Sequence, residues 1–337
     1  MRADRLFAYG ATAGLIADRW LGDPRRGHPV AGFGRAAAAV EKHLWRDHRG
    51  RGALHTLLCA GGAVGAAALA SRAVHRSPAA AVALTAAVTW SVVGGTSLGR
   101  EARAIGAALD AGDVEAARER LPHLCGRDPQ ALDGPGIARA VVESVAENTS
   151  DAVVGALVWG ALGGVPGLVG FRAVNTLDAM VGHRSPRHRR FGWASARLDD
   201  VMGWPGARLT AALAAVAGGR PGQAVRAWRA DAGRHPSPNA GPVEAAFAGA
   251  LGVRLGGTLA YGGRIEHRPV LNGAEGRAVA VETGDIERAV RLSRRVSVLA
   301  LAVCVAGRLA AGRGATRPVG TRRTGTQGHM ITERGRA

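Results

Sequence analysis

The amino-acid sequence predicts an all-α protein that crosses a membrane with about four to six segments joined by helical polar loops. Three features support this fold class. Nearly half of the 337 residues (47%) are hydrophobic, whereas aromatic residues make up only 4%. The hydrophobic residues gather in runs close to the length of a membrane-spanning helix. Basic stretches separate these runs, and none of useful length shows the alternation of a β-strand.

The clearest membrane segments are residues 53–70 and 79–98. Each has about 18 to 20 residues without an acid or an arginine, roughly what a helix needs to cross the hydrocarbon layer. The basic connection between them, residues 71–78, is short enough for a helical hairpin. We therefore expect two antiparallel membrane helices here.

A third apolar segment, residues 152–174, contains Gly163-Gly164-Val165-Pro166-Gly167 in its middle. Glycine and proline at this point predict either a kinked span or a re-entrant segment. For the weaker candidates, a soluble bundle of Ala-rich buried helices is an equal alternative. Those weaker candidates are 201–218, 296–311 and 6–21.

The polar regions between these segments also show helical patterns. Residues 101–109 and 114–121 have apolar positions at helix spacing, and Asp113 is suited to cap the second helix. Further along, residues 223–230 and 243–251 predict two helices separated by a Pro-rich turn. We expect residues 1–312 to form one membrane domain, followed by a basic, disordered tail over 313–337.

The formal net charge is +18. It fits a biased composition, a nucleic-acid-binding protein or a membrane protein with basic cytoplasmic loops. The arginines lie between the apolar segments and no stacking aromatic pattern accompanies them, so we expect a membrane protein and no nucleic-acid partner. The three cysteines form no CxxC pair, which predicts neither a zinc motif nor a disulfide framework. The N-terminal apolar stretch is interrupted by Asp18 and Arg19, and we expect no signal peptide.

An acidic stripe is the first candidate for chemistry. Glu143, Glu147 and Asp151 recur at every fourth position, so on a helix they share one face. Stacked carboxylates repel one another unless a cation neutralises them, and Mg²⁺ prefers such oxygen ligands. The alternative is an ordinary solvated acidic face. Asn148 follows Glu147, and the stripe runs directly into an apolar segment, which favours a functional role.

A second group leaves the apolar segment that follows. Arg172, Asn175 and Asp178 are three residues apart and lie near one face of a helix. The arginine could bind a phosphate, and the other two a hydroxyl, an amine or a metal. An internal salt bridge between Arg172 and Asp178 is an almost equal alternative.

Two further groups are weaker on their own. Arg197 precedes the adjacent acids Asp199 and Asp200, a pair found in metal sites but also on ordinary helix surfaces. In the segment from Ser237 to Asn239, prolines fix an extended backbone that leads into a helix, with Glu244 expected at the helix start. Such a helix start can hold an anion, although a plain helix lead-in is the simpler interpretation.

Near the N-terminus, Asp18 precedes the turn signal Gly22-Asp23-Pro24, and His28 follows in a short polar stretch. A single histidine is more often structural than catalytic. No Walker loop, GxGxxG loop, HExxH or GxSxG motif occurs in the sequence. A site that uses ATP is therefore not a P-loop.

Taken in this order, the five groups resemble one family, the CobD/CbiB adenosylcobinamide-phosphate synthases of cobalamin biosynthesis. The similarity rests on Glu-Ser-x-x-Glu-Asn, Asn-Thr-Leu-Asp-x-Met and Ala-Arg-Leu-Asp-Asp, which are far more specific together than singly. The chain departs from the family pattern at Gly203, which stands where an Asn is usual, so no role of that Asn is transferred. The resembling stretches are 18–30, 143–151, 172–182, 191–208 and 237–263.

The resemblance implies a multi-pass enzyme of the cell (cytoplasmic) membrane. It would join an amino-alcohol phosphate, such as aminopropanol phosphate, to a propionate carboxylate of adenosylcobyric acid, with ATP as co-substrate and Mg²⁺ as the ion. Its partners would be these substrates, membrane lipid and other membrane enzymes of the same pathway. The alternative is a non-catalytic membrane protein or transporter of the same fold.

A carboxylate must be activated before an amine can attack it, and phosphate-bound Mg²⁺ assists that step. With the resemblance, this chemistry assigns three sets of residues as hypotheses. The expected catalytic residues are Glu143, Glu147, Asn148 and Asp178. The expected substrate- or phosphate-binding residues are Arg172, Asn175, Arg197, Ser237 and Asn239. The expected metal ligands are Asp151, Asp199 and Asp200.

Overall fold

The computed structural model describes residues 2–24, 27–183, 185–261, 264–273 and 278–314. It confirms the all-α fold class, because four helical stretches are long and apolar enough to cross a membrane. These stretches are Arg49–Val74, Pro78–Asp110, Gly134–Val181 and Gly284–Arg313. Most of the predicted tail lies outside the described residues.

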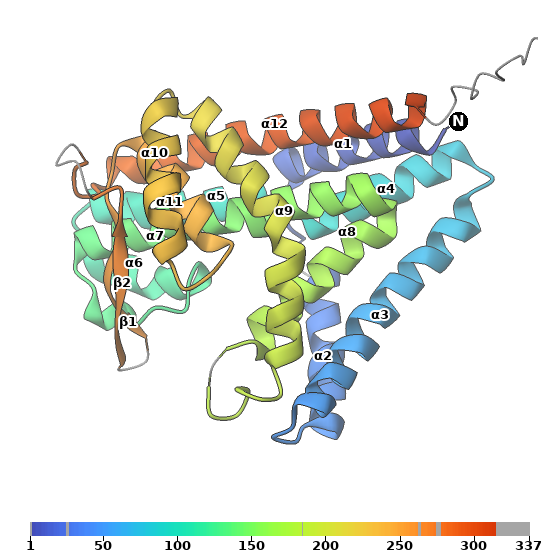
Figure 1. Ribbon diagram of the computed structural model, residues 1–337, viewed down its shortest axis with the longest axis horizontal. Helices are drawn as coiled ribbons and strands as arrows, with labels where there is room; N and C mark the ends of the chain where they lie inside the picture. The colour runs from blue at the N-terminus through green and yellow to red at the C-terminus, as the bar shows by residue number, and fades with distance from the viewer. Residues whose placement is uncertain (1, 25–26, 184, 262–263, 274–277, 315–337) are drawn as a thin grey trace, which may run out of the picture.

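The helices and strands follow one another along the chain with short connections (Figure 1). The first half contains α1 (Ala3–Leu21), α2 (Pro29–Leu44), α3 (Arg49–Val74), α4 (Pro78–Val92), α5 (Gly95–Asp110), α6 (Val114–Arg120) and α7 (Gly134–Thr149). The second half contains the π-turn η3 (Ser150–Val154), α8 (Gly155–Val181), α9 (Trp193–Ala217), α10 (Pro221–Asp231), α11 (Ala240–Leu251), β1 (Leu255–Tyr261), β2 (Arg264–Leu271) and α12 (Gly284–Gly314). Short 3₁₀ turns are Leu121–His123, Pro129–Ala131 and Ala232–Arg234.

Small residues allow the membrane helices to approach closely. Helix α1 packs along α4, where a Cβ added at Gly10 would lie 2.4 Å from Thr85 Cβ, and one at Gly14 would lie 2.5 Å from Thr89 Cβ. Lipid offers little hydrophobic drive for helix association, so close packing of small side chains supplies much of the attraction. The low aromatic content of the sequence therefore fits this mode of packing.

Helix α8 turns back on itself, as the sequence predicts for a re-entrant segment. Gly164 has φ 64° and ψ −145°, a conformation almost restricted to glycine. The two arms then run side by side, since a Cβ added at Gly167 would lie 2.0 Å from the carbonyl oxygen of Trp159, and one at Gly160 would lie 2.8 Å from the side chain of Leu168. Figure 1 shows the two arms in green.

The weaker membrane candidates have mixed outcomes. Residues 296–311 lie within α12, which is long and apolar enough to cross a membrane. Residues 201–218 and 6–21 form helices α9 and α1, but neither belongs to the four stretches of sufficient length and hydropathy among the described residues. Charged side chains within both helices lower their mean hydropathy.

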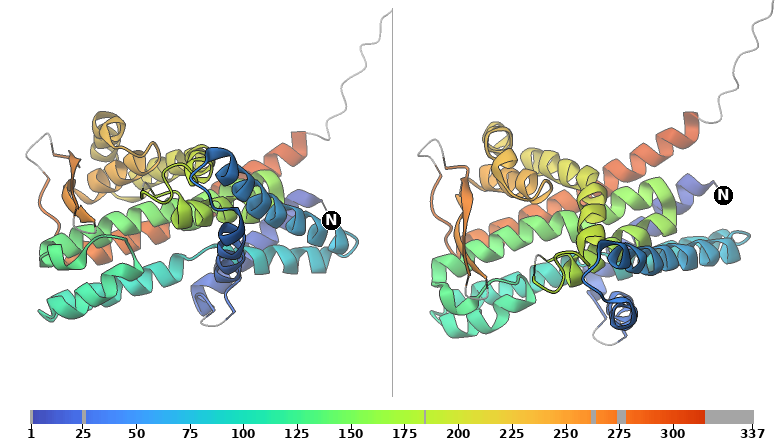
Figure 2. Two further views of the ribbon diagram at one scale, coloured as in Figure 1. Left: turned by 90° about the horizontal axis from the view of Figure 1, so that it is seen from below. Right: turned by 60° about the horizontal axis from the view of Figure 1, so that its bottom comes forward.

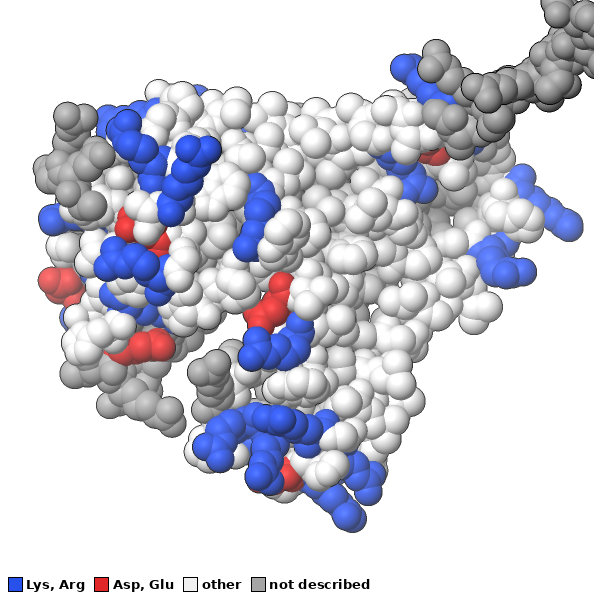
Figure 3. Space-filling view, in the orientation of Figure 1, with Lys and Arg blue, Asp and Glu red and all other residues white. Residues whose placement is uncertain are grey.

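One end of the molecule carries most of the polar elements. We call it the polar end: α6, α10, α11, the two strands and the adjoining parts of α5 and α7 (Figures 1 and 2). The chain start and the α3–α4 connection lie at the opposite end. Figure 3 shows charged side chains at the polar end and around the lower ends of α2 and α9, with a broad uncharged surface between the two ends.

The predicted helices of the polar end are confirmed with shifted limits. Asp113 caps α6, because its Oδ1 accepts a hydrogen bond from Ala116 N at 2.9 Å. Helix α11 begins at Ala240, so Glu244 lies inside the helix and is buried, not at the helix start as expected. Ser237 accounts for the early start, because its Oγ accepts from the amide of Ala240.

The expectation of no useful strand is wrong for one segment. Strands β1 and β2 pair antiparallel as a two-stranded hairpin, with a register shift between Leu255 and Gly257. Gly256 and Gly257 both have positive φ (78° and 89°). This bulge interrupts the alternation that would identify β1 from its sequence.

Candidate active site

Seven carboxylates from four parts of the fold gather where the polar end meets the apolar helices. Each lies within electrostatic range of at least one other member of the group. They come from α7 with its π-turn, from α8, from α9 and from α11. We call this group the acidic cluster: Glu143, Glu147, Asp151, Asp178, Asp199, Asp200 and Glu244.

Glu143 anchors the hairpin to α7. Its side chain is buried and forms an ion pair with the buried Arg127. Its other oxygen, Oε1, accepts a hydrogen bond from Gly256 N at 2.6 Å. Both carboxylate oxygens are therefore occupied by protein groups. The geometry gives Glu143 a structural role, and the catalytic role expected from the sequence remains a prediction.

Glu147 lies one turn further along α7, and its environment differs. Its side chain is exposed to solvent although protein atoms surround it closely. Arg268 of β2 and Arg127 are the positive charges in its surroundings. Among the described residues, no hydrogen bond occupies its carboxylate. Of the two glutamates of the stripe, Glu147 is thus the one available to a substrate.

Asp151 occupies the π-turn between α7 and α8. A π-turn adds a residue to one helical turn and often occurs at functional sites. Asp151 remains close to Glu147, whose negative charge is part of its surroundings. Asp151 also lies near Asp199 and Arg172, on the side of α8 and α9.

A chain of contacts runs from α8 to α9. Arg172 donates from Nη1 to Asn175 Oδ1 at 3.3 Å, and Asn175 donates from Nδ2 to Asp199 Oδ1 at 3.4 Å. Arg172 forms no ion pair with Asp178, so the alternative of an internal salt bridge is wrong. Nε of Arg172 is buried and has no hydrogen-bond partner. Such an orphaned donor is costly unless a ligand satisfies it.

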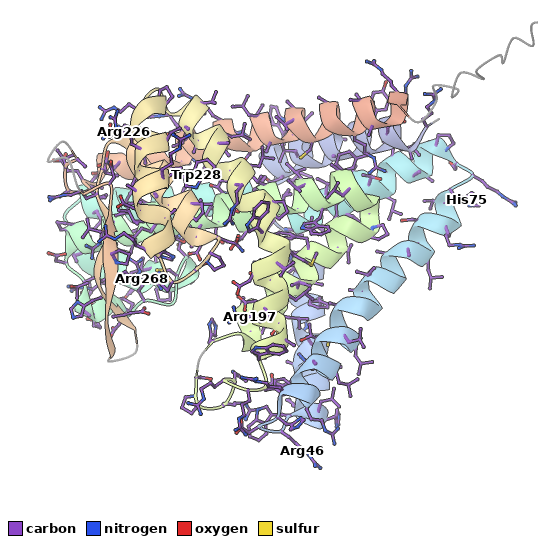
Figure 4. The ribbon with its side chains drawn as sticks, viewed as in Figure 1. Arg46, His75, Arg197, Arg226, Trp228 and Arg268 are labelled. Carbon is purple, nitrogen blue, oxygen red and sulfur yellow. The ribbon has the colours of Figure 1, made fainter. Side chains whose placement is uncertain are left out.

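The adjacent acids of α9 point into different surroundings. Asp199 lies in the cluster, where burial and then the charge of Asp178 raise its pKa to about 7. Asp200 pairs with Arg197 at 3.2 Å, and the Arg197 side chain is 64% exposed. Arg197 (labelled in Figure 4) thus stands at the rim of the cluster. Its expected phosphate contact remains a prediction.

Asp178 ends the membrane arm of α8 and is only partly exposed. An added Cβ at Gly182 would lie 1.8 Å from Asp178 Oδ1, so glycine at this position leaves room for the carboxylate. The negative charge of Asp200 is part of its surroundings. The structure therefore places Asp178 inside the acidic cluster, beside the metal-ligand candidates of α9.

Helix α11 contributes a buried acid that the sequence did not single out for catalysis. Burial, together with the nearby charges of Glu143 and Glu147, raises the pKa of Glu244 well above its ordinary value. His235 Nε2 lies 3.8 Å from Glu244 Oε1, and burial lowers the pKa of this histidine. A protonated Glu244 limits the negative charge that the cluster must hold.

Asn239 and Ser237 hold α11 against α9. Asn239 accepts from Arg208 Nη1 at 2.9 Å through Oδ1 and donates from Nδ2 to the carbonyl of Asp200 at 2.9 Å. An added Cβ at Gly203 would lie 2.6 Å from Asn239 Nδ2, which explains why glycine fits there. With Ser237 capping the same helix, both residues have structural contacts, and their expected role in binding substrate remains a prediction.

Asn148 faces a different space from Glu147. Its Nδ2 donates to the carbonyl of Ser144 at 2.9 Å, and its side chain lines a cavity of about 360 Å³ that Arg172 and Asp23 also line. The cavity adjoins the acidic cluster because Arg172 belongs to both. The sequence noted the turn at Asp23 but did not connect it with this cavity.

The acidic cluster fits a Mg²⁺ ion that arrives with a nucleotide. Among the described residues, no three His, Cys, Asp or Glu side chains lie close enough to form a ready-made ligand set. Mg²⁺ commonly uses one or two protein carboxylates, and water and substrate phosphates complete its shell. The raised pKa of Asp199 indicates negative charge that the protein compensates poorly. Asp151, Asp199 and Asp200 would hold such an ion.

Sequence patterns gave little signal for the arginines of the site. Arg127 lies in a loop and Arg268 on β2, where Figure 4 labels it at the polar end. Both are near Glu147 only because the hairpin and the loop fold over α7. Neither is part of a recognisable motif, and one of many arginines in a chain of net charge +18 cannot be singled out.

The sequence is similar to known proteins over most of its length. A family model described as CobD/Cbib protein matches residues 11–293. A protein of Mycobacterium tuberculosis named cobalamin biosynthesis protein CobD is 55% identical over 304 residues, which cover 88% of this chain and 95% of that protein. Proteins with the same name from Chromobacterium violaceum and Rhodobacter capsulatus are 43% and 42% identical. They cover 83% and 80% of this chain and match over 90% and 86% of their own lengths.

No solved structure matches the chain. The family match extends from α1 into α12 and includes every element that contributes to the acidic cluster. With this coverage, and with the identity to the mycobacterial protein over most of both lengths, the chain belongs to the CobD/CbiB family.

Proposed function

We propose that this protein is an ATP-dependent amide ligase of cobalamin biosynthesis in the cell membrane. It joins an amino-alcohol phosphate to a propionate carboxylate of adenosylcobyric acid and releases adenosylcobinamide phosphate. Family membership and the name of the relatives, cobalamin biosynthesis protein CobD, support the pathway. The four long apolar helices support a membrane location.

One observation supports the reaction type above all others: the acidic cluster, bordered by arginines, lies where the polar end meets the apolar helices. Phosphoryl transfer needs cations held by carboxylates and arginines that bind phosphate oxygens. Arg172, Arg127 and Arg268 border the cluster from three different elements. A solvated acidic face would not bury its carboxylates or surround them with arginines from distant parts of the chain.

The first step activates the carboxylate of the corrinoid substrate. A carboxylate oxygen attacks the γ-phosphorus of ATP, the bond from that phosphorus to the β–γ bridging oxygen breaks, and ADP leaves. Bound Mg²⁺ would supply charge neutralisation on the phosphates. Arg268, a positive charge in the surroundings of Glu147, would attract the phosphates of the nucleotide. Asp199 and Asp151, which lie on the same side of the cluster, would face the nucleotide.

The second step forms the amide. The amine attacks the acyl carbon, the bond from that carbon to the phosphate oxygen breaks, and inorganic phosphate leaves. The nitrogen must also lose a proton, which Glu147 would accept on a carboxylate oxygen. We assign this role to Glu147 because its carboxylate is accessible and no hydrogen bond from a described residue occupies it. Asp178 would lie near the nucleotide site and contribute its negative charge there.

The test uses the full-length protein in detergent with adenosylcobyric acid, aminopropanol phosphate, ATP and Mg²⁺. The corrinoid amide is measured by mass, and the nucleotide products are separated. We expect the amide together with ADP and phosphate in equal amounts. With ¹⁸O in the substrate carboxylate, one labelled oxygen should appear in the released phosphate.

Glu147→Gln should lower kcat by about 10²-fold or more, as for other residues that accept a proton in the rate-limiting step. Glu115→Gln is the matched control, because the Glu115 side chain is 62% exposed on α6, where it contacts Arg118 and Gln130. If AMP and pyrophosphate were formed instead of ADP and phosphate, the carboxylate would be activated by adenylation and not as an acyl phosphate. A folded wild-type protein that forms no amide would favour a non-catalytic membrane protein.

A further inference from the structure

The cavity beside the acidic cluster has charged side chains of both signs in its wall. Arg172 is the basic one, Asp23 and Glu101 are acidic, and His123 also lines it. Glu101 is paired with Arg120 and His123. The cavity has a volume of about 360 Å³ and is lined by Asp23, Gly94, Ser97, Asn148 and Arg172, among others. The first turn of α5 forms part of its wall. A space of this size admits a small molecule but not a corrinoid macrocycle. We call this space the Arg172 cavity.

Asp23 and Arg172 flank Gly94 from two sides. A Cβ added at Gly94 would lie 3.7 Å from Asp23 Oδ2 and 3.8 Å from Arg172 Nη2. The two charged atoms are therefore at most about 7.5 Å apart, the sum of these distances. Among the described residues they do not form an ion pair with each other. Two opposite charges thus face one small space without neutralising each other.

Each of the two groups also has an unsatisfied atom. Arg172 Nε and Asp23 Oδ1 are buried and accept or donate no hydrogen bond. The nearest charged group to Asp23 Oδ1 is His28 Nε2, at 3.8 Å. Leaving a buried polar atom without a partner is unfavourable, and native structures usually satisfy such atoms with protein, water or a ligand. The pair predicts a ligand with an acceptor at one end and a donor at the other.

We propose that the Arg172 cavity is the subsite for the amino-alcohol phosphate, with Arg172 binding its phosphate and Asp23 binding its ammonium group. The inference rests on the proposed function and adds where this substrate is held. A small zwitterion with an amine and a phosphate separated by two carbons matches both the charges and the size.

The cavity is also in the right place for the reaction. Asn148, which lines it, follows Glu147 in the sequence, and Arg172 connects through Asn175 to Asp199. A molecule held between Asp23 and Arg172 would therefore lie next to the acidic cluster. Asp23 here is a binding residue that orients the ammonium group. The nitrogen can attack the acyl carbon only as the neutral amine, so the ammonium leaves this ion pair and releases one proton to solvent before the attack. The second proton goes to Glu147 as the amide forms.

The test measures binding without ATP or corrinoid, by titration calorimetry of the full-length protein in detergent. The probes are 1-aminopropan-2-yl phosphate, isopropyl phosphate without the amine, and 1-aminopropan-2-ol without the phosphate. Glycerophosphoethanolamine, a phosphodiester, represents a lipid headgroup of the same chemistry. We expect wild type to bind the amine phosphate about tenfold or more tightly than any of the other three, as for a charge-assisted hydrogen bond.

Three variants separate the roles. Asp23→Asn should weaken the binding of 1-aminopropan-2-yl phosphate about tenfold and leave the binding of isopropyl phosphate unchanged. Arg172→Gln should weaken both phosphate probes by similar factors. Gly94→Val should exclude all probes by filling the cavity, and its φ of −128° is open to any residue. Arg229→Gln, on the exposed surface of α10, is the control and should bind like wild type.

If the probes bind in this pattern but the protein forms no amide, the subsite proposal stands and the proposed ligase function is wrong. Amide formation with an unchanged KM for the amine in Asp23→Asn and Gly94→Val would overturn the subsite and keep the ligase. Equal or tighter binding of the phosphodiester would also overturn the assignment, because the occupant would then be a lipid headgroup.

Discussion

The Glu143 carboxylate accepts a hydrogen bond from the Gly256 amide at 2.6 Å and pairs with Arg127 on its other side. This contact joins a membrane-proximal helix to a hairpin more than a hundred positions later in the sequence. Gly257, next to Gly256 in the bulge, is paired across the hairpin with Arg268. The anchor therefore determines where Arg268 stands relative to Glu147.

Removal of the anchor should cost stability before it affects chemistry. Glu143→Ala leaves the buried Arg127 without its ion pair, and breaking such a pair costs about 3–5 kcal/mol in free energy of unfolding. Unfolding in detergent by heat or denaturant measures the loss. Glu115→Ala, which breaks an exposed pair with Arg118, should leave the free energy of unfolding nearly unchanged.

If Glu143→Ala unfolded like the control and yet formed no amide, Glu143 would instead belong to the reaction. The double variant Glu143→Leu with Arg127→Leu offers a second measure. It should recover part of the lost stability, because neither charge is then left alone in the interior.

Stability of the ligand-free protein should fall with rising pH because of Asp199. Its folded-state pKa of about 7 exceeds the unfolded value of about 3.9. The folded state therefore holds this proton more tightly than the unfolded state does. The resulting stabilisation of the folded protein is complete below about pH 4 and is lost as the pH rises to about 7. Asp199→Asn should raise Tm relative to wild type by an amount that grows with pH up to about 7 and is constant above it.

Mg²⁺ provides the complementary measurement at this carboxylate. A cation binds the ionised form, so added Mg²⁺ should raise the Tm of wild type more at pH 8 than at pH 6. Asp199→Asn should show a smaller and nearly pH-independent rise. Equal effects of Mg²⁺ in both proteins would exclude Asp199 as a ligand.

The turn between the arms of α8 should depend on Gly164. Alanine in its conformation, φ 64° and ψ −145°, is strained by about 1–3 kcal/mol. No atom lies within 4 Å of the Cβ that this substitution adds, so the cost comes from the backbone alone. Gly163→Ala is the matched control, because its added Cβ is equally free and its φ is not positive. Thermal unfolding in detergent should lower Tm only for Gly164→Ala.

Arg308 should hold the tip of the same re-entrant segment. Its guanidinium donates to the carbonyls of Gly160 and Ala161 and lies 5.3 Å from the ring centroid of Phe7. Arg308→Ala leaves carbonyls at the end of a helical arm without this donor, which should cost about 1–3 kcal/mol. Limited proteolysis at the turn and Tm both report the change. Arg291→Ala, an exposed position on the same helix, should change neither.

The sequence by itself determined the class of the fold, the family and most members of the site. Apolar runs of bilayer length predict membrane helices because the hydrocarbon thickness sets their length. Glycine and proline in the third run predicted a kinked span or a re-entrant segment, and the turn forms at Gly164, since only glycine adopts that backbone geometry at low cost. The motifs located the carboxylates of α7, α8 and α9, because such residues are expensive beside a membrane unless they have a function.

Tertiary structure alone decided what each of these residues contacts. Glu143 and Glu147 look equivalent in the sequence, yet one is buried against Arg127 and the other is open to substrate. The packing of α7 against α8 and α9 brings Asp151 near Asp199 and Arg172 as well as Glu147. A hairpin hidden by its bulge brings Arg268 near Glu147 of α7. Asp23 and Arg172, about 150 positions apart in the sequence, face one cavity. Helical period relates only residues of one helix, whereas these contacts depend on how separate helices pack.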